Sequence, residues 1–120
     1  MAIDPEIIRR GAVVVIRLPN DKARPAVVVR SDLLFELSYA TVLPITSDLQ
    51  EGMSLRIDVK PSEANGLRTP SQVMADWPQT LRLTEVAQII GYLDRATMQA
   101  ITQQMAVVLG IGATRLRRLH

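Results

Sequence analysis

The chain of 120 residues contains no cysteine, and its only histidine is the last residue, His120. Without cysteine these residues hold no disulfide framework, no thiolate nucleophile and no zinc site with sulfur ligands, which fits a reducing cytoplasm. A single histidine also excludes an acid–base pair of two histidines. We therefore expect no metal site and no cofactor.

Aromatic residues and long apolar runs are scarce as well. Aromatic residues make up 3% of the chain, too few for broad platforms on which bases stack, so any contact with nucleic acid must rely on charge and hydrogen bonds. The longest apolar run, residues 12–16, is far too short to cross a bilayer. The N-terminal residues lack the apolar stretch of a signal peptide. We expect a soluble, cytoplasmic protein with no membrane contact.

Charge is nearly balanced, with 14 Lys and Arg against 12 Asp and Glu and a net charge of +2. Such a chain has no strong field that attracts polyanions from a distance. Twelve of the 14 positive residues are arginine, whose planar guanidinium suits phosphate. The composition therefore permits a local phosphate site without requiring one.

The length and the 48% hydrophobic content are those of one globular domain. No internal repeat, low-complexity segment or linker divides the chain. We expect a single domain over residues 1–120, with its core at about residues 10–110 and a flexible basic tail at 113–120.

Runs rich in β-branched residues predict strands at 12–18, 26–30 and 39–45. The first two runs are almost continuously apolar, which indicates burial on both faces, whereas the run 55–60 alternates apolar and polar residues and predicts one wet face. The connections are too short for the crossovers that parallel strands need. We therefore predict an antiparallel sheet, folded as a small barrel or sandwich.

Near the end of the chain the hydrophobic period becomes that of a helix. Asp94 is a suitable N-cap for residues 95–110, and Gly110 is a suitable C-terminal stop. Apolar residues recur between them at spacings of 3, 4 and 3, at Met98, Ile101, Met105 and Val108. We expect this stripe to pack against the sheet.

Six segments occur in a characteristic order: RGAVVVI (10–16), RPAVVV (24–29), VLPITS (42–47), NGL (65–67), VMADWPQT (73–80) and IIGYLDRATMQAI (89–101). In this order and spacing they resemble the MazF/PemK family of bacterial toxin ribonucleases over about residues 10–110. The resemblance implies a mainly β (α+β) fold, a small, strongly bent antiparallel SH3-like barrel of the CcdB/MazF/PemK toxin type with a C-terminal α-helix. It also implies a homodimer.

The same resemblance implies the toxin of a toxin–antitoxin pair, which cleaves single-stranded mRNA at short sequences without metal. The 2′-hydroxyl of a ribose attacks the adjacent phosphate, and Arg24 matches the arginine that stabilises the charge on the phosphoryl oxygens. Arginine keeps its proton at neutral pH, so a stabilising role is preferred to that of a general acid. Thr46 matches a threonine that bonds the same phosphate, and Asp76 matches an aspartate that serves as base in some relatives. The implied partner is an antitoxin whose disordered acidic tail lies in the RNA groove.

Other residues are expected to bind RNA, and some of them depart from the family pattern. The first loop is short, residues 19–23, and Gln79 stands where relatives carry a basic residue. Trp77 offers a ring on which a base can stack, which partly offsets that missing charge. Arg82 points to the opposite face of a regular strand and is a less obvious substitute. The full expected RNA-binding set is Lys22, Arg30, Ser47, Trp77, Gln79 and Arg82.

Two alternatives remain open on the sequence. A toxin of the gyrase-poison branch shares the fold, but that branch relies on an apolar tail containing tryptophan, whereas this chain ends in TRLRRLH and has its only tryptophan at position 77. A relative that has lost catalysis and only binds RNA is suggested by Gln79 and the short first loop. Asp76 is as well suited to ordering a turn as to moving a proton, and Asn65–Gly66 is interpreted only as a turn signal.

Overall fold

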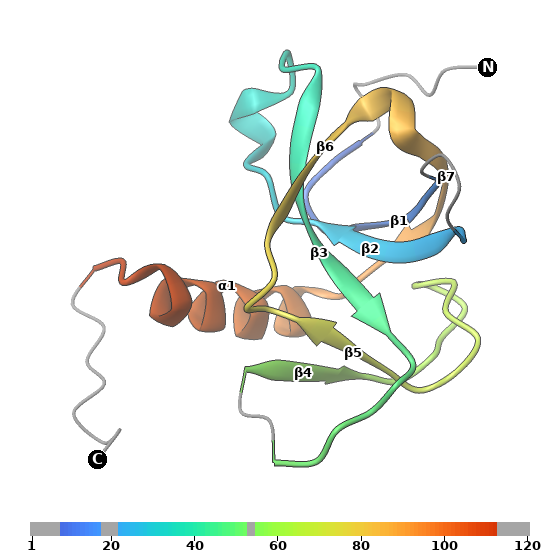
Figure 1. The fold of residues 1–120 in the computed structure, drawn as a ribbon, viewed down its shortest axis with the longest axis vertical. Helices are drawn as coiled ribbons and strands as arrows, with labels where there is room; N and C mark the ends of the chain where they lie inside the picture. The colour runs from blue at the N-terminus through green and yellow to red at the C-terminus, as the bar shows by residue number, and fades with distance from the viewer. Residues whose placement is uncertain (1–7, 18–21, 53–54, 113–120) are drawn as a thin grey trace.

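The computed structural model describes residues 8–17, 22–52 and 55–112. Seven strands and one α-helix are joined by short connections, two of which contain 3-10 turns, η2 (Asp32–Leu34) and η3 (Leu83–Glu85) (Figure 1). The expected tail at 113–120 and most of the short first loop lie outside the described residues. The elements are β1 (Ala12–Ile16), β2 (Arg24–Val28), β3 (Tyr39–Thr46), β4 (Arg56–Val59), β5 (Ser71–Met74), β6 (Gln79–Arg82), β7 (Val86–Tyr92) and α1 (Arg95–Leu109).

The strands form one antiparallel sheet in the order β4-β5-β3-β2-β1-β7, and β6 pairs with β3 beside β5. The predicted antiparallel sheet with a C-terminal helix is therefore confirmed. The sheet is strongly bent but not closed, since no pairing within the described ranges joins β7 to β4 or to β6. The expected barrel is thus corrected to an open, curled sheet.

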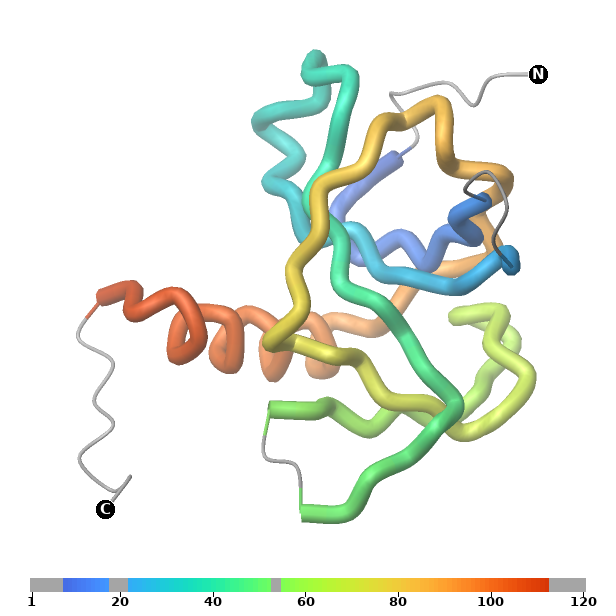
Figure 2. Tube along the Cα trace, viewed as in Figure 1, coloured from blue at the N-terminus to red at the C-terminus, as the bar shows by residue number. Residues whose placement is uncertain are grey.

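Pro44 accounts for the division of one long partner of β3 into β5 and β6. Val29 N–H donates to the Thr41 carbonyl, so the backbone groups of Thr41 point toward β2. Backbone groups alternate in direction along a strand, so the nitrogen of Pro44, three residues later, points away from β2. A proline nitrogen has no hydrogen to donate to the strand on that side. The partner strand breaks there, between Met74 and Gln79, and the trace of β3 passes both pieces from the top of the view to the lower right (Figure 2).

The sheet buries hydrophobic clusters on both of its faces. Alternate residues of β1 and β2 supply each of them, so Val14 and Ala26 belong to one cluster while Val13 and Val27 belong to the other. This confirms that these two strands are buried on both faces. The second cluster lies under α1, which contributes the fully buried Ile101, and the helix extends away from the sheet on the left of Figure 1.

The predicted helix is confirmed together with both of its ends. Asp94 caps the first turn, and Gly110 adopts the left-handed conformation (φ 67°) at the C-cap. Three strands were not predicted as strands, because β5 and β6 are short and rich in polar residues and β7 alternates irregularly. No helix in the described part of the chain is long and apolar enough to cross a membrane.

The helix cap makes stability depend on pH. The Asp94 carboxylate accepts hydrogen bonds from the side chain and the backbone N–H of Thr97, and these bonds lower its pKa below the ordinary value of 3.8. A group with a lowered folded pKa adds stability above its unfolded pKa and loses it as the pH falls through the folded value. We therefore expect the melting temperature of the wild type to exceed that of Asp94→Asn at neutral pH, and this difference to shrink below pH 3.8. Thermal unfolding followed by circular dichroism measures this difference in melting temperature. A difference that stays constant with pH would contradict the role of the Asp94 carboxylate as the helix cap.

Candidate active site

The start of β2 and the end of β3, which are neighbouring strands, bring Arg24 and Thr46 to the same end of the sheet. Arg24 begins β2 and Thr46 ends β3, and the two strands pair antiparallel with Ala26 opposite Pro44. Continuing that register by two residues places Arg24 opposite Thr46. Both residues line a cavity of about 660 Å³. The start of β2 and the end of β3 therefore lie side by side at this cavity.

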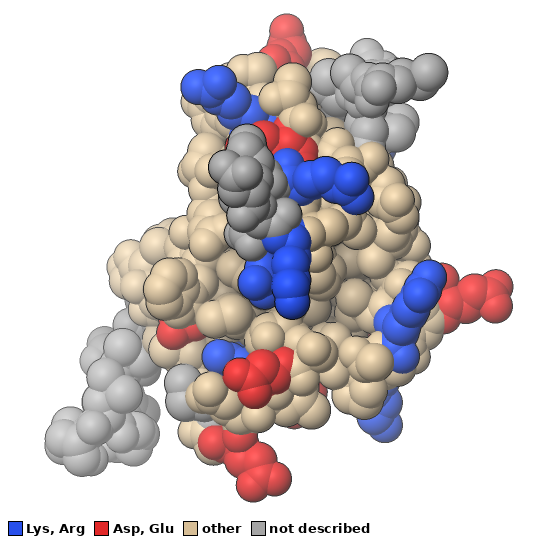
Figure 3. All heavy atoms as spheres, turned by 45° about the vertical axis from the view of Figure 1, so that its right-hand side comes forward, with Lys and Arg blue, Asp and Glu red and all other residues tan. Residues whose placement is uncertain are grey.

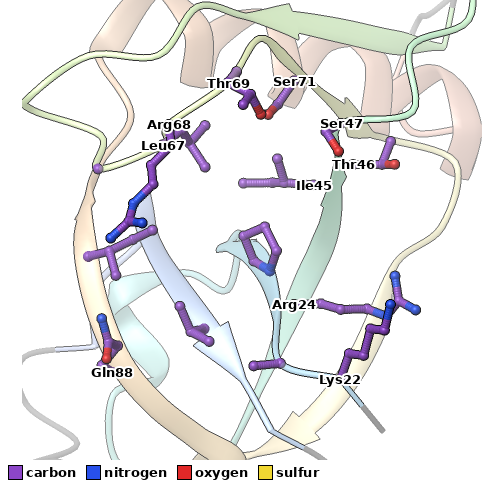
Figure 4. Close-up of a pocket in the computed structure, with 15 residues that line it drawn as sticks. Lys22, Arg24, Ile45, Thr46, Ser47, Leu67, Arg68, Thr69, Ser71 and Gln88 are labelled. Carbon is purple, nitrogen blue, oxygen red and sulfur yellow. The ribbon is translucent and has the colours of Figure 1, made fainter.

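The alternation of side chains sorts this end of the sheet into a rim and a floor. Arg24 and Thr46 project to the same side in Figure 4, away from the middle of the cavity. Ile45 lies in the middle of the cavity in the same view, and it forms an apolar floor with Pro25, the lining residue that follows Arg24. Ser47 extends the rim beyond Thr46. A ligand that rests on the floor therefore has a guanidinium and hydroxyl groups along one border.

A second, smaller cavity of about 250 Å³ lies on the other side of the same rim. It shares Lys22, Arg24 and Pro25 with the first cavity and adds Pro44 and Gln79. The two hollows therefore meet at the amino end of β2. Arg24 stands at that junction, so an extended ligand that occupies both hollows passes Arg24.

A loop between β4 and β5, residues 60–70, forms the wall opposite Arg24. Asn65 is only 6% exposed and holds this loop. Its side-chain oxygen accepts from the N–H groups of Ser62 (3.0 Å) and Leu67 (2.9 Å), and its amide donates to the Lys60 carbonyl (2.9 Å). Asn65 and Gly66 thus do more than make a turn, because they build a wall of the site.

The cavity is positively charged although the chain as a whole is nearly neutral. Among the residues that the structure describes, its lining contains three cations and no acidic side chain. In the space-filling view, Lys and Arg side chains gather near the middle of the face, and the most protruding acidic side chains stand at its margins (Figure 3). Charge of one sign in a hollow attracts a polyanion even when net charge is small. The three cations are Lys22, Arg24 and Arg68.

The Thr46 hydroxyl is oriented by the backbone that follows it. Its oxygen accepts a hydrogen bond from Asp48 N–H (3.0 Å), and the Asp48 carbonyl in turn accepts from Arg56 (3.0 Å). Arg56 also donates to the buried Gln72 (3.2 Å), which lies directly opposite Thr46 on β5. A hydroxyl that already accepts one bond still has its proton to donate. This network therefore presents a fixed donor at the rim.

Two predicted residues lie in the turn between β5 and β6. Asp76 is partly buried and lines neither cavity. Trp77 is 56% exposed, more open than a residue needed for the core. Gln79, two residues further on, does reach the smaller cavity.

Arg30 and Arg82 lie away from this site. Arg82 pairs with Tyr39 at the start of β3, whereas Thr46 is at its end. Arg30 is only 5% exposed, and its guanidinium donates to three backbone carbonyls, two at or just before the start of β3 and one near the N-terminus. The expectation that Arg30 binds RNA is therefore corrected: it holds the chain around β2 and offers RNA almost no surface. The three carbonyls belong to Ile8, Leu37 and Tyr39.

Sequence reasoning missed the wall that faces Arg24. Arg68, Thr69, Ser71 and Gln88 line the larger cavity from the 60–70 loop, β5 and β7. None belongs to a motif, and they come together only when the loop packs on β7. The one sequence signal was the NGL segment, which immediately precedes Arg68. Among the described residues, no group of three His, Asp or Glu side chains is placed to hold a metal ion, and metal independence stays a prediction.

Comparison with solved structures identifies the fold. The chain superimposes on the Mycobacterium tuberculosis toxin MazF-mt6 with a TM-score of 0.73 and 27% identity, covering 84% of this chain and 98% of that one. A mycobacterial endoribonuclease in complex with its cognate antitoxin gives a TM-score of 0.75 at 22% identity, covering 88% and 98%. The fold is that of the MazF toxins.

Sequence comparison then gives the family. Residues 9–109 match the model described as PemK-like, MazF-like toxin of type II toxin-antitoxin system. A probable endoribonuclease MazF of Mycolicibacterium smegmatis is 30% identical over 90 residues, 75% of this chain and 83% of that protein. Endoribonuclease MazF3 of Mycobacterium tuberculosis is 35% identical over 74 residues, 61% and 69% of the two chains. The protein belongs to the PemK/MazF toxin family, which confirms the resemblance noted from its motifs.

Proposed function

We propose that the protein is the toxin of a toxin–antitoxin pair and cleaves single-stranded mRNA at short sequences without a metal ion. The observation that carries the proposal is the meeting of Arg24 and Thr46 on one rim of a positively charged groove that contains no acidic lining residue. The endoribonuclease names of the relatives agree with it. A groove of this kind suits a flexible polyanion, and a rim with one fixed cation suits chemistry at one phosphate.

In the proposed mechanism the 2′-hydroxyl oxygen attacks the neighbouring phosphorus and the bond to the 5′-oxygen breaks. The products are a 2′,3′-cyclic phosphate and a free 5′-hydroxyl, whose oxygen takes a proton from solvent water as it leaves. Negative charge builds on the phosphoryl oxygens during attack, so the Arg24 guanidinium binds the transition state more strongly than the ground state. Thr46 donates to the same phosphate, and its orientation is fixed through Asp48 N–H. Asp76, from the turn that leads to Gln79, is the carboxylate we propose as acceptor of the 2′-hydroxyl proton.

The test is incubation of purified protein with single-stranded RNA in EDTA. We expect cleavage at short sequences, with a cyclic phosphate on one product and a 5′-hydroxyl on the other. Replacing the 2′-hydroxyl at the cut site by hydrogen should abolish cleavage there and nowhere else. A requirement for added metal, or cleavage of the deoxy substrate, would refute the mechanism. Inhibition of DNA supercoiling by gyrase, without RNA cleavage, would favour the alternative of a gyrase poison.

The proposed partners are a cognate antitoxin with a disordered acidic tail and a second copy of the chain, and the proposed setting is the cytoplasm. The absence of acidic residues from the groove lining supports binding of an acidic tail. Exposed apolar side chains such as Leu33 and Phe35 support burial of part of the surface against another protein chain.

A further inference from the structure

We propose that Arg68 and Gln88 form a second nucleotide subsite on the wall opposite Arg24, which binds the nucleotide next to the cleaved bond. The inference rests on the proposed RNA-cleaving function. It assigns to Arg68 the phosphate contact and to Gln88 the reading of one base.

The Arg68 guanidinium is available to a ligand. Within the part of the chain that the structure describes, no hydrogen bond or ion pair involves its side chain, which is exposed. Figure 4 shows it extending from the top of the cavity along the wall toward Gln88. None of the described residues that line the cavity carries a carboxylate. A cation over a hollow whose described lining is neutral or positive favours an anion.

The backbone that carries Arg68 is fixed, unlike that of an ordinary surface arginine. Gly66, two residues before Arg68, lies so close to β7 that an added Cβ would stand 2.2 Å from the Ile90 carbonyl oxygen. Tyr92 N–H donates to the Ala64 carbonyl (2.9 Å), which ties the loop to β7 a second time. A cation on a rigid support loses less freedom when it binds, so its contact contributes more to affinity.

The geometry of the cavity separates two phosphate contacts. Arg24 and Arg68 line opposite walls, and the cavity of about 660 Å³ is within the usual range for a complete small ligand, larger than one phosphate needs. With the cleaved phosphate at Arg24, the neighbouring nucleotide extends over the apolar floor toward Arg68. Thr69 lies at the top of the view, next to Ser71 (Figure 4).

Gln88 is placed to contact a base. It lies on β7 opposite Val15, which in turn lies opposite Pro25 on β2, so Gln88 stands where the floor meets the wall opposite Arg24 (Figure 4). Its amide offers both donors and an acceptor, which can distinguish base edges. The cavity lining contains no aromatic ring, so recognition there depends on hydrogen bonds rather than on stacking.

The experiment measures binding of fluorescent single-stranded RNA that carries a 2′-deoxy nucleotide at the cut site, at several salt concentrations. Arg68→Ala should weaken binding about tenfold and lower the slope of log affinity against log salt by about 0.7, the value for one phosphate contact on a single strand. In cleavage of ordinary RNA it should raise KM more than it lowers kcat. Gln88→Leu should keep the salt slope and change the preferred nucleotide at one position of the cut sequence.

The matched control is Arg95→Ala, which removes the same charge from an exposed position outside both cavities. An affinity and salt slope for Arg68→Ala equal to those of the control would overturn the subsite. Weaker binding of a poly-glutamate peptide without weaker binding of RNA would overturn it too, and would assign the wall to an acidic peptide. The binding measurement needs no cleavage, so it tests the subsite alone. Failure of the proposed function would be seen in a different experiment, as wild-type protein that does not cleave RNA.

Discussion

Replacement of Arg24 with alanine is expected to lower the rate of RNA cleavage by at least roughly 100-fold at saturating RNA, the usual loss when one preorganised charge stabiliser is removed. The loss should fall on kcat because the charge that Arg24 meets develops mainly in the transition state. Binding of the uncleavable 2′-deoxy RNA should weaken far less, since Lys22 and Arg68 still line the groove. Single-turnover cleavage in EDTA, together with anisotropy for binding, separates the two effects.

The control for this experiment is again Arg95→Ala, whose cleavage rate should match that of the wild type. Arg24→Lys keeps the charge but loses the planar pair of donors, so it should recover only part of the rate. Full activity of Arg24→Ala would remove the basis of the proposed mechanism. A loss of binding as large as the loss of rate would make Arg24 a binding residue and not a stabiliser of the transition state.

The sequence predicted those parts of the site that depend on neighbouring strands. Arg24 and Thr46 each follow or precede an apolar run, and antiparallel pairing of consecutive strands brings the ends of such runs together. The helix was equally predictable, because its stripe, its cap and its glycine stop are local signals. Local signals and consecutive pairing are what a single sequence displays most clearly.

The parts that were missed depend on packing between distant segments. Arg68 faces Arg24 only because the 60–70 loop packs on β7, more than twenty residues further along the chain. Arg30 ends an apolar run just as a surface arginine does, and its burial depends on three carbonyls from two separate segments. The closure of the sheet was overestimated for the same reason, since pairing between its first and last strands has no local signature. Asp76 remains a proposed base whose position lies outside both cavities.

Gly66→Ala should destabilise the protein by about 3 kcal/mol, the sum of a strained backbone and an overpacked contact. Gly66 has φ +72°, a left-handed conformation that alanine adopts at a cost, and the new methyl group would stand 2.2 Å from the Ile90 carbonyl oxygen. That atom belongs to the backbone of β7 and cannot turn aside as a side chain can. The loop must therefore move away from the strand. Urea unfolding followed by circular dichroism, at one protein concentration for all variants, measures the change.

Gly52→Ala is the control that separates the two causes. Gly52 has almost the same backbone angle, φ +73°, but no atom lies within 4 Å of its added Cβ. It should lose only the backbone contribution, about 1 kcal/mol. Equal losses in the two variants would show that the loop does not press on β7. Gly66→Ala should also weaken RNA binding, because displacement of the loop carries Arg68 away from the wall that it shares with Gln88. Gly52→Ala should bind RNA as the wild type does.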